Sequence, residues 1–289
     1  MRLDLATVLL QVAAGGLLGC WITTRRREVG IGYGWTLRIT YITLALLAAV
    51  SGFLQNVSGA GATFRDVAAI GVASAAGLAL WSSVVRRKAG VRGHREVRAA
   101  RKQRVAAMLG NAPADEGADP TPAGPEFDPR LDLLAPVIGA IGILGAASAV
   151  GGPYALSAVR LLVGAAFLGI ITDAMLLGHW YLVQPGLDRA PVKQLVVIVA
   201  CLWPLEVAVY LWPQGMVQVL DGTIDDGFAG ILGWTWLLCA ISTIALIGVT
   251  WLALKERSYS AVMSATGLLY LAILTGFGTD LIARATLIP

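Results

Sequence analysis

Charged side chains are scarce in this sequence. Asp, Glu, Lys and Arg make up 14% of the 289 residues, whereas a soluble domain has about 25%. Hydrophobic residues make up 57%, so much of the surface needs lipid rather than water around it. The net charge of +4 does not indicate nucleic acid, because the basic residues cluster in loops between apolar runs. They favour binding to anionic lipid headgroups.

Cysteine and histidine are also rare, with three and two residues respectively. Cys20, Cys201 and Cys239 lie in different apolar runs, and this spacing excludes a disulfide framework and a structural metal site. Of the two histidines, His94 lies in a basic stretch and is expected to be solvated. There is no serine–histidine–acid set, no metal-binding cluster of carboxylates and histidines, and no phosphate loop. The sequence therefore assigns no catalytic residue and leaves enzymatic activity undecided.

Long apolar runs are what the sequence does contain. Runs of about 20 apolar residues are long enough to cross a bilayer as helices. We therefore expect an all-α protein, a polytopic integral membrane bundle of about eight transmembrane helices. The spans are predicted near 3–23, 32–54, 66–85, 132–150, 155–183, 194–212, 228–253 and 259–283. Leu17–Cys20 resembles a lipoprotein cleavage box, but three arginines follow the first run, which favours an uncleaved span.

The basic residues predict the orientation. If the spans alternate, the 22 lysines and arginines all fall on one side except Arg2, Arg65, Arg160 and Arg284. Basic loops stay in the cytoplasm, so we expect both termini outside a bacterial cytoplasmic membrane. The acidic loop 213–227 is then outside.

One sizeable soluble segment divides the spans. Residues 1–85 form a three-span membrane segment, 86–131 a cytoplasmic basic helix and flexible linker, and 132–289 a five-span membrane segment. The basic helix is expected to lie on the inner headgroups, and the proline-rich stretch 111–130 reads as the linker. The predicted headgroup contacts are Arg86, Arg87, Lys88, Arg101 and Lys102.

Two acids lie at membrane depth, where an ionisable side chain costs roughly 2.5–3.5 kcal/mol. Asp173 in the fifth span and Glu206 in the sixth are both near the midplane, and successive spans are usually neighbours. We expect the two carboxyl groups to face each other and one of them to exchange protons. Pro204 can kink the sixth span beside Glu206, and Trp203 adds aromatic bulk. The alternative is a neutral, hydrogen-bonded acid that holds helices together.

His179 lies nearer the cytoplasmic end of the fifth span. At 100° per residue it shares a face with Thr172, while Trp180 shares another face with Asp173, so we expect this helix to be enclosed by other helices. His179 suits a quinone carbonyl or a proton path. Haem held by two histidines is disfavoured, because no second histidine lies in a span. A helix–helix hydrogen bond is the alternative.

The remaining membrane-depth residues have structural interpretations. Asp280 and Arg284 have the spacing and order of a helical ion pair. Arg160 needs an acid such as Asp280, or its head must extend outward to water. Gly139, Gly142 and Gly145 are expected to allow close helix packing.

These features favour an integral membrane subunit of a larger bacterial complex, respiratory or otherwise redox. Such a subunit would anchor other membrane subunits and line a quinone or proton path with Asp173, His179, Glu206, Trp180 and Trp203. The alternative is a proton-coupled carrier of a small solute, in which Asp173 and Glu206 are the coupling acids and Pro204 marks a hinge. A weak repeat, which aligns 157–172 with 260–275, is compatible with this alternative. A lipid-modifying enzyme is a third possibility, with only His179 and the basic loop to support it.

Overall fold

The computed structural model describes residues 3–25, 28–55, 59–87, 127–183, 187–213, 215–256 and 258–287. These residues contain eight helical segments that are long and apolar enough to cross a membrane. The predicted count and the helical class are therefore confirmed, and the chain is a multi-pass membrane protein. The segments are α1 (Leu5–Thr24), α2 (Ile31–Gln55), α3 (Ala60–Val85), η1 with α5 (Pro129–Leu133 and Leu134–Ala147), α6 (Tyr154–Val183), α7 (Ala190–Leu211), α9 (Ile231–Ala253) and α10 (Tyr259–Thr286).

The fourth span lies closer to the N-terminus than the predicted 132–150. It begins with the 3-10 helix η1, where Pro129 takes the first helical position and the Asp128 carboxylate accepts the Arg130 N–H at 3.0 Å. It ends at Ala147, shortly before Gly151 and Gly152, whose positive φ angles of 82° and 81° do not continue a helix. Most of the predicted basic helix and linker, with Lys88, Arg101 and Lys102, lies outside the described residues.

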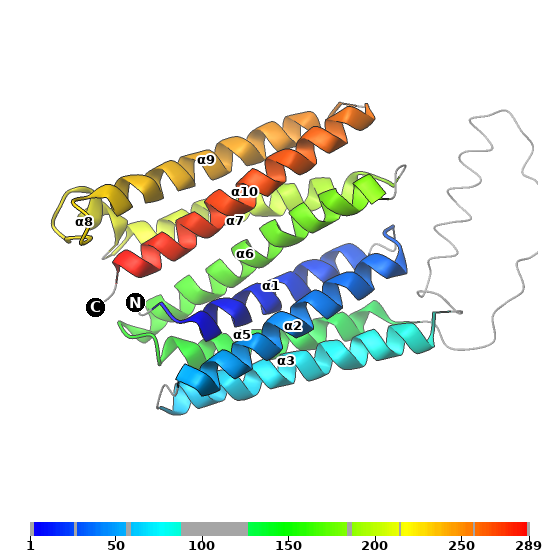
Figure 1. Cartoon of the computed structure of the whole chain (residues 1–289), viewed down its shortest axis with the longest axis horizontal. Coiled ribbons are helices and arrows are strands. Elements are labelled where there is room, and N and C mark those ends of the chain that lie inside the picture. Colours follow the sequence, from blue (N-terminus) through cyan, green and yellow to red (C-terminus); the bar gives the residue numbers. More distant parts are fainter. Residues whose placement is uncertain are drawn as a thin grey trace, which may run out of the picture.

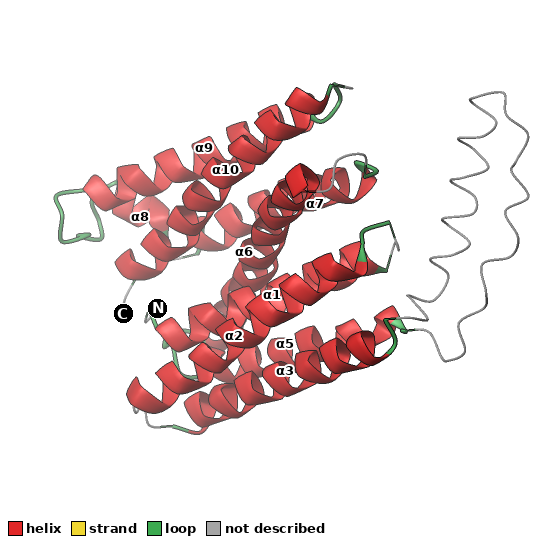
Figure 2. Cartoon of the chain, turned by 45° about the vertical axis from the view of Figure 1, so that its right-hand side comes forward, coloured by secondary structure: helices red, strands yellow, loops and turns green. Residues whose placement is uncertain are grey.

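Helices α1 and α6 form the centre of the bundle. The sequence of α1 is apolar on every face, so it can be surrounded by other helices. Helices α2, α3 and α5 pack together on one side of α1, and α7 and α10 pack against α6, with α9 beside α10 (Figure 2). Both chain ends lie at the same end of the bundle (Figure 1), as an even number of spans requires.

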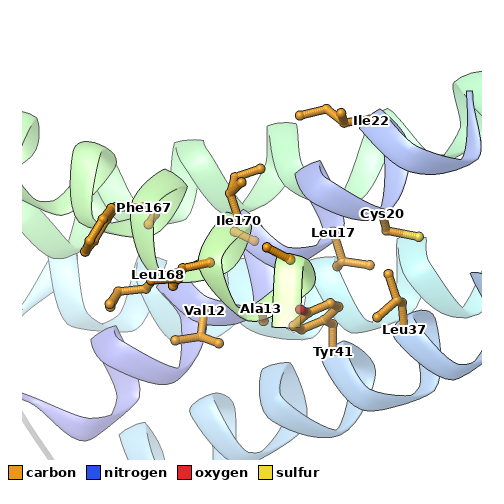
Figure 3. Packing of buried hydrophobic residues seen from close by; sticks show 14 of the residues in the cluster. Val12, Ala13, Leu17, Cys20, Ile22, Leu37, Tyr41, Phe167, Leu168 and Ile170 are labelled. Carbon is orange, nitrogen blue, oxygen red and sulfur yellow. The ribbon is translucent and has the colours of Figure 1, made fainter. Parts of the chain in front are cut away.

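Glycine brings the two central helices into backbone contact. A Cβ atom on Gly15 would lie 1.8 Å from the carbonyl oxygen of Ala165, and one on Gly169 would lie 2.0 Å from the carbonyl carbon of Gly15. No other residue type fits at such a crossing. On another face, α1 packs against α2; Figure 3 shows Leu37 and Tyr41 of α2 beside Leu17 and Cys20 of α1.

The glycines of α5 act as their spacing predicts. A Cβ on Gly139 would lie 2.4 Å from the Cβ of Ala14, and one on Gly142 would lie 2.4 Å from the Cβ of Ala68. The missing side chains let α5 pack closely against both α1 and α3.

Buried ion pairs fasten the N-terminal helices at both ends. At the end near the termini, Arg65 of α3 pairs with Asp4, the N-cap of α1, and with Asp66 at 2.7 Å. At the opposite end, Arg38 of α2 forms a bidentate pair with Asp132 of η1 at 2.8 and 2.7 Å. Arg38 is 2% exposed, so the pair is buried within the bundle. Its partner was not apparent from sequence because Asp132 follows the long linker.

The connection between α7 and α9 contains a short helix, α8 (Met216–Leu220), which was not predicted (Figure 1). In this loop, Asp226 accepts the backbone N–H groups of Phe228, Gly230, Leu232 and Gly233. Desolvation disfavours the charged form of this carboxyl group, but the four donors outweigh it and hold the pKa of Asp226 below its ordinary value. Asp226 therefore serves as the anchor for the start of α9.

Candidate functional site

A buried polar cluster is centred on Arg284 of α10. Its guanidinium group donates to Asp280 at 2.7 Å, to the Tyr210 hydroxyl at 3.1 Å and to the Gln11 side-chain oxygen at 2.6 Å. Tyr210 in turn donates to Asp280 at 2.9 Å. We call Gln11, Glu206, Tyr210, Asp280 and Arg284 the Arg284 cluster. It joins α1, α7 and α10 beside α6.

Local sequence explains how this cluster forms. Asp280 and Arg284 are four residues apart on α10, with the acid first, so they share one face of the helix. Gly164 of α6 supplies the space, because a Cβ there would lie 2.8 Å from the Asp280 Oδ1 atom and 3.0 Å from an Arg284 nitrogen. Gln11 is fixed by a second hydrogen bond, from its side-chain nitrogen to the Leu161 carbonyl oxygen at 2.6 Å.

Glu206 of α7 is the unsatisfied member of the cluster. It is fully buried, and neither of its carboxyl oxygens has a hydrogen-bond donor among the described residues. Its side chain interacts with the carboxyl group of Asp280, whose Oδ2 atom also has no donor among the described residues. Two carboxylates cannot hydrogen-bond to each other, and in close contact they cannot both be charged. A single proton between them would link one oxygen of each group and leave the pair with one negative charge.

Arg160 lies at the edge of this cluster. It donates from Nε to the Val209 carbonyl oxygen at 2.7 Å, and its guanidinium carbon lies 5.4 Å from the centre of the Tyr210 ring. The Val209 carbonyl and the face of the Tyr210 ring both stabilise a cation at this depth. Asp280, the acid suggested for Arg160 from sequence, pairs with Arg284 instead.

A second buried acid lies at the contact of α1, α2 and α6. Asp173 of α6 is fully buried and accepts a hydrogen bond from the Tyr41 hydroxyl of α2. Its Oδ2 atom has no partner among the described residues. Gly16 and Gly19 of α1 make room for the pair, because a Cβ on Gly19 would lie 2.1 Å from Oδ2 and one on Gly16 would lie 2.0 Å from the Tyr41 ring.

Comparisons with known families, curated proteins and solved structures find no match.

The structure separates the acids that the sequence analysis expected to face each other. Asp173 points from α6 toward α1 and α2, whereas Glu206 points from α7 toward α10. The expected contact between them was wrong. The reason is that α6 is central and has neighbours on all sides, so adjacency of α6 and α7 along the chain does not fix which face carries Asp173.

His179 also departs from its prediction. It is exposed on the surface of the bundle rather than enclosed, and its Nδ1 atom lies 3.3 Å from the Tyr270 hydroxyl of α10. This is the helix–helix hydrogen bond considered as the alternative. Trp180 packs against Tyr33, with ring centres 5.8 Å apart, and Trp203 donates to the Ala240 carbonyl oxygen of α9 at 2.9 Å. These residues therefore belong to separate helix contacts.

Several residues of the Arg284 cluster and the Tyr41 partner of Asp173 were missed from sequence. Gln11 carried a signal, because an amide in an apolar run is costly unless it is paired. Tyr41 and Tyr210 carried none, because tyrosine is common in membrane helices and its hydroxyl needs only one partner. Within the described ranges, no group of three or more His, Cys, Asp or Glu residues is placed to hold a metal ion.

Proposed function

We propose that this chain is a proton-coupled membrane carrier and that Glu206 and Asp280 hold the coupling proton. The supporting observation is that these two carboxyl groups are both fully buried, have oxygens without donors among the described residues and interact with each other beside Arg284. When the pair holds a proton, the negative charge that remains is balanced by Arg284. When the proton leaves, a second negative charge is created in a fully buried site, and the helices around it must rearrange to solvate or pair it.

The cluster is built to couple that rearrangement to helix movement. Arg284 contacts α7 through Tyr210, α1 through Gln11 and its own helix through Asp280. A change in the charge of Glu206 therefore acts on contacts between several helices. Pro204 interrupts the backbone hydrogen bonding of α7 close to Glu206 and gives that helix a place to bend.

The proposed setting is the bacterial cytoplasmic membrane, with basic loops inside and both termini outside. Glu206 and Asp280 lie near the α7 and α10 ends that face the termini. At a rise of about 1.5 Å per residue, each is about 8–9 Å from the end of its helix. In this orientation the Arg284 cluster exchanges its proton with the outside. The headgroup contacts of Arg86 and Arg87, at the end of α3, remain part of the same proposal.

The test uses protein reconstituted in vesicles that enclose a pH-sensitive dye. Small solutes of different classes, among them amino acids, sugars and organic cations, are added outside one at a time, and the internal pH is followed. We expect one class to change the internal pH with the wild-type protein. The effect is lost in Glu206→Gln and Asp280→Asn, which have nearly the same shape but cannot release a proton.

Asp225→Asn is the matched control, because it removes a carboxyl group from an exposed loop. It should leave the solute-dependent pH change intact. Wild-type protein that moves no protons with any solute, or a Glu206→Gln variant as active as the wild type, would refute the proposal.

One observation favours the second candidate, a subunit of a larger redox complex. His179 and Tyr270 expose polar groups on the surface of two membrane-spanning helices, where contact with lipid chains is unfavourable. A partner subunit or a quinone carbonyl would satisfy them. Purification from native membranes in mild detergent, followed by mass analysis and absorption spectra, tests this candidate. Protein that emerges alone and without quinone contradicts it.

A further inference from the structure

The surroundings of Asp173 differ from those of the buried acids that form ion pairs. Asp4 and Asp66 pair with Arg65, Asp132 with Arg38, and Asp280 with Arg284. Among the described residues, the only hydrogen-bond partner of Asp173 is the neutral Tyr41 hydroxyl. An unpaired charge in the membrane interior is costly, whereas a protonated carboxyl group is neutral, and its carbonyl oxygen can still accept the Tyr41 hydrogen bond.

We infer that Asp173 and Tyr41 form a second proton-binding site, separate from the Glu206–Asp280 pair. The ligand is a proton, bound at the Oδ2 atom of Asp173, which has no partner. Release leaves the Asp173 carboxylate, which keeps the Tyr41 hydrogen bond, and passes the proton to water that enters when α1 and α6 separate. The protonation of Asp173 does not depend on the proposed function. Only the role of Asp173 in coupling rests on that function.

The groups around Asp173 do not supply a compensating charge. On α1 the titratable group near Asp173 is the buried thiol of Cys20. On α2 the titratable groups near it are the hydroxyls of Tyr33 and Tyr41. Arg38 lies farther toward the end of the helices, and its charge is matched by the bidentate contact with Asp132.

The other elements packed on α6 direct their titratable groups elsewhere. The charged groups of α7 and α10 that reach α6 belong to the Arg284 cluster. Tyr270 of α10 faces His179 at the surface. Asp173 therefore has no described counter-charge on any face of its helix.

The glycine crossing separates the two proton sites. Along α6, Gly164 contacts the Arg284 cluster, and Asp173 lies about 14 Å farther along the axis. Between them, the backbones of α1 and α6 are in contact at Gly15 and Gly169. The two sites are thus placed to exchange protons with opposite sides of the membrane.

Infrared spectroscopy tests this inference, because a protonated carboxyl group has a carbonyl stretch that a carboxylate lacks. The full-length protein is reconstituted in phosphatidylethanolamine–phosphatidylglycerol vesicles at neutral pH. We expect one protonated-carboxyl band to be lost in Asp173→Asn and to shift in Tyr41→Phe, which removes the hydrogen bond. A second band is lost in Glu206→Gln and is unaffected by both of those changes.

The controls separate the two proposals. Asp4→Asn removes an acid paired with Arg65 and should remove no band. If Asp173→Asn and Tyr41→Phe both leave the spectrum unchanged, Asp173 is not protonated and the second site is refuted, whatever Glu206 does. If only the Glu206 band is missing from the wild type, the coupling proposal fails and the Asp173 site stands. Asparagine has nearly the shape of a protonated aspartate, so Asp173→Asn is expected to fold.

Discussion

At the scale of single residues, the important distinction is between buried acids with and without a counter-charge. Asp4, Asp66 and Arg65 illustrate the first kind, with the Arg65 side chain 2% exposed. Removing one member of such a group leaves a charge buried without a partner, which is far more destabilising than removing the whole group.

We therefore expect Arg65→Met to lower the free energy of unfolding by about 3–5 kcal/mol. Adding Asp4→Asn and Asp66→Asn to that variant should recover part of the loss, because no unpaired carboxylate remains. Unfolding of the purified protein in mixed micelles, followed by circular dichroism, measures both effects. Equal stability of Arg65→Met and the wild type would show that the ion pairs do not hold α1 and α3 together.

At the scale of helices, glycine decides which elements approach most closely. Gly15 and Gly169 bring the backbones of α1 and α6 into contact. Gly139 and Gly142 let α5 pack closely against α1 and α3. Glycines that face open space have no such role. Gly77 of α3 has no atom within 4 Å of the position where a Cβ would be.

Gly15→Ala is expected to lower the free energy of unfolding by at least about 1–3 kcal/mol, the usual cost of overpacking. Its new methyl group would collide with the Ala165 carbonyl oxygen. Gly77→Ala is the matched control and should be neutral or stabilising by up to about 1 kcal/mol, because alanine favours helix. Thermal unfolding of both variants in the same detergent compares them. A harmless Gly15→Ala would mean that α1 and α6 are farther apart than the structure places them.

At the scale of the whole molecule, the chain is organised as two groups of helices around the α1–α6 contact. The N-terminal group is fastened by buried ion pairs at both of its ends. Arg189 provides a further link, since it donates to backbone oxygens of Glu256 and Ser258 across the loops of the C-terminal group. In the proposed carrier, the C-terminal helices would move against this firmly held N-terminal group.

The proposed orientation predicts which loops are accessible from outside. In a variant whose native cysteines are replaced by alanine, a cysteine at Thr223 should react with a membrane-impermeant maleimide on intact cells. A cysteine at Glu256 should react only after the membrane is permeabilised. Both positions are exposed on the protein, so burial does not obscure the result. The reverse pattern would place the termini and the Arg284 cluster on the cytoplasmic side.

Sequence by itself determined the class of the protein and its number of spans. Apolar runs of membrane length and basic loops are local properties, and they do not depend on how the helices pack. The ion pair of Asp280 and Arg284 was also accessible, because four residues on one helix fix the spacing of two side chains.

Only the tertiary structure decided which partners the membrane-depth acids have. The rotation of each helix is set by packing with all of its neighbours, and the apolar faces of these helices are too alike to reveal it. Asp173 therefore meets Tyr41, far from it in sequence, and Glu206 meets Asp280. The single predicted site became two, because α6, which carries Asp173, lies between the two groups of helices. The glycines that allow the close packing of α6 also determine where its polar side chains lie.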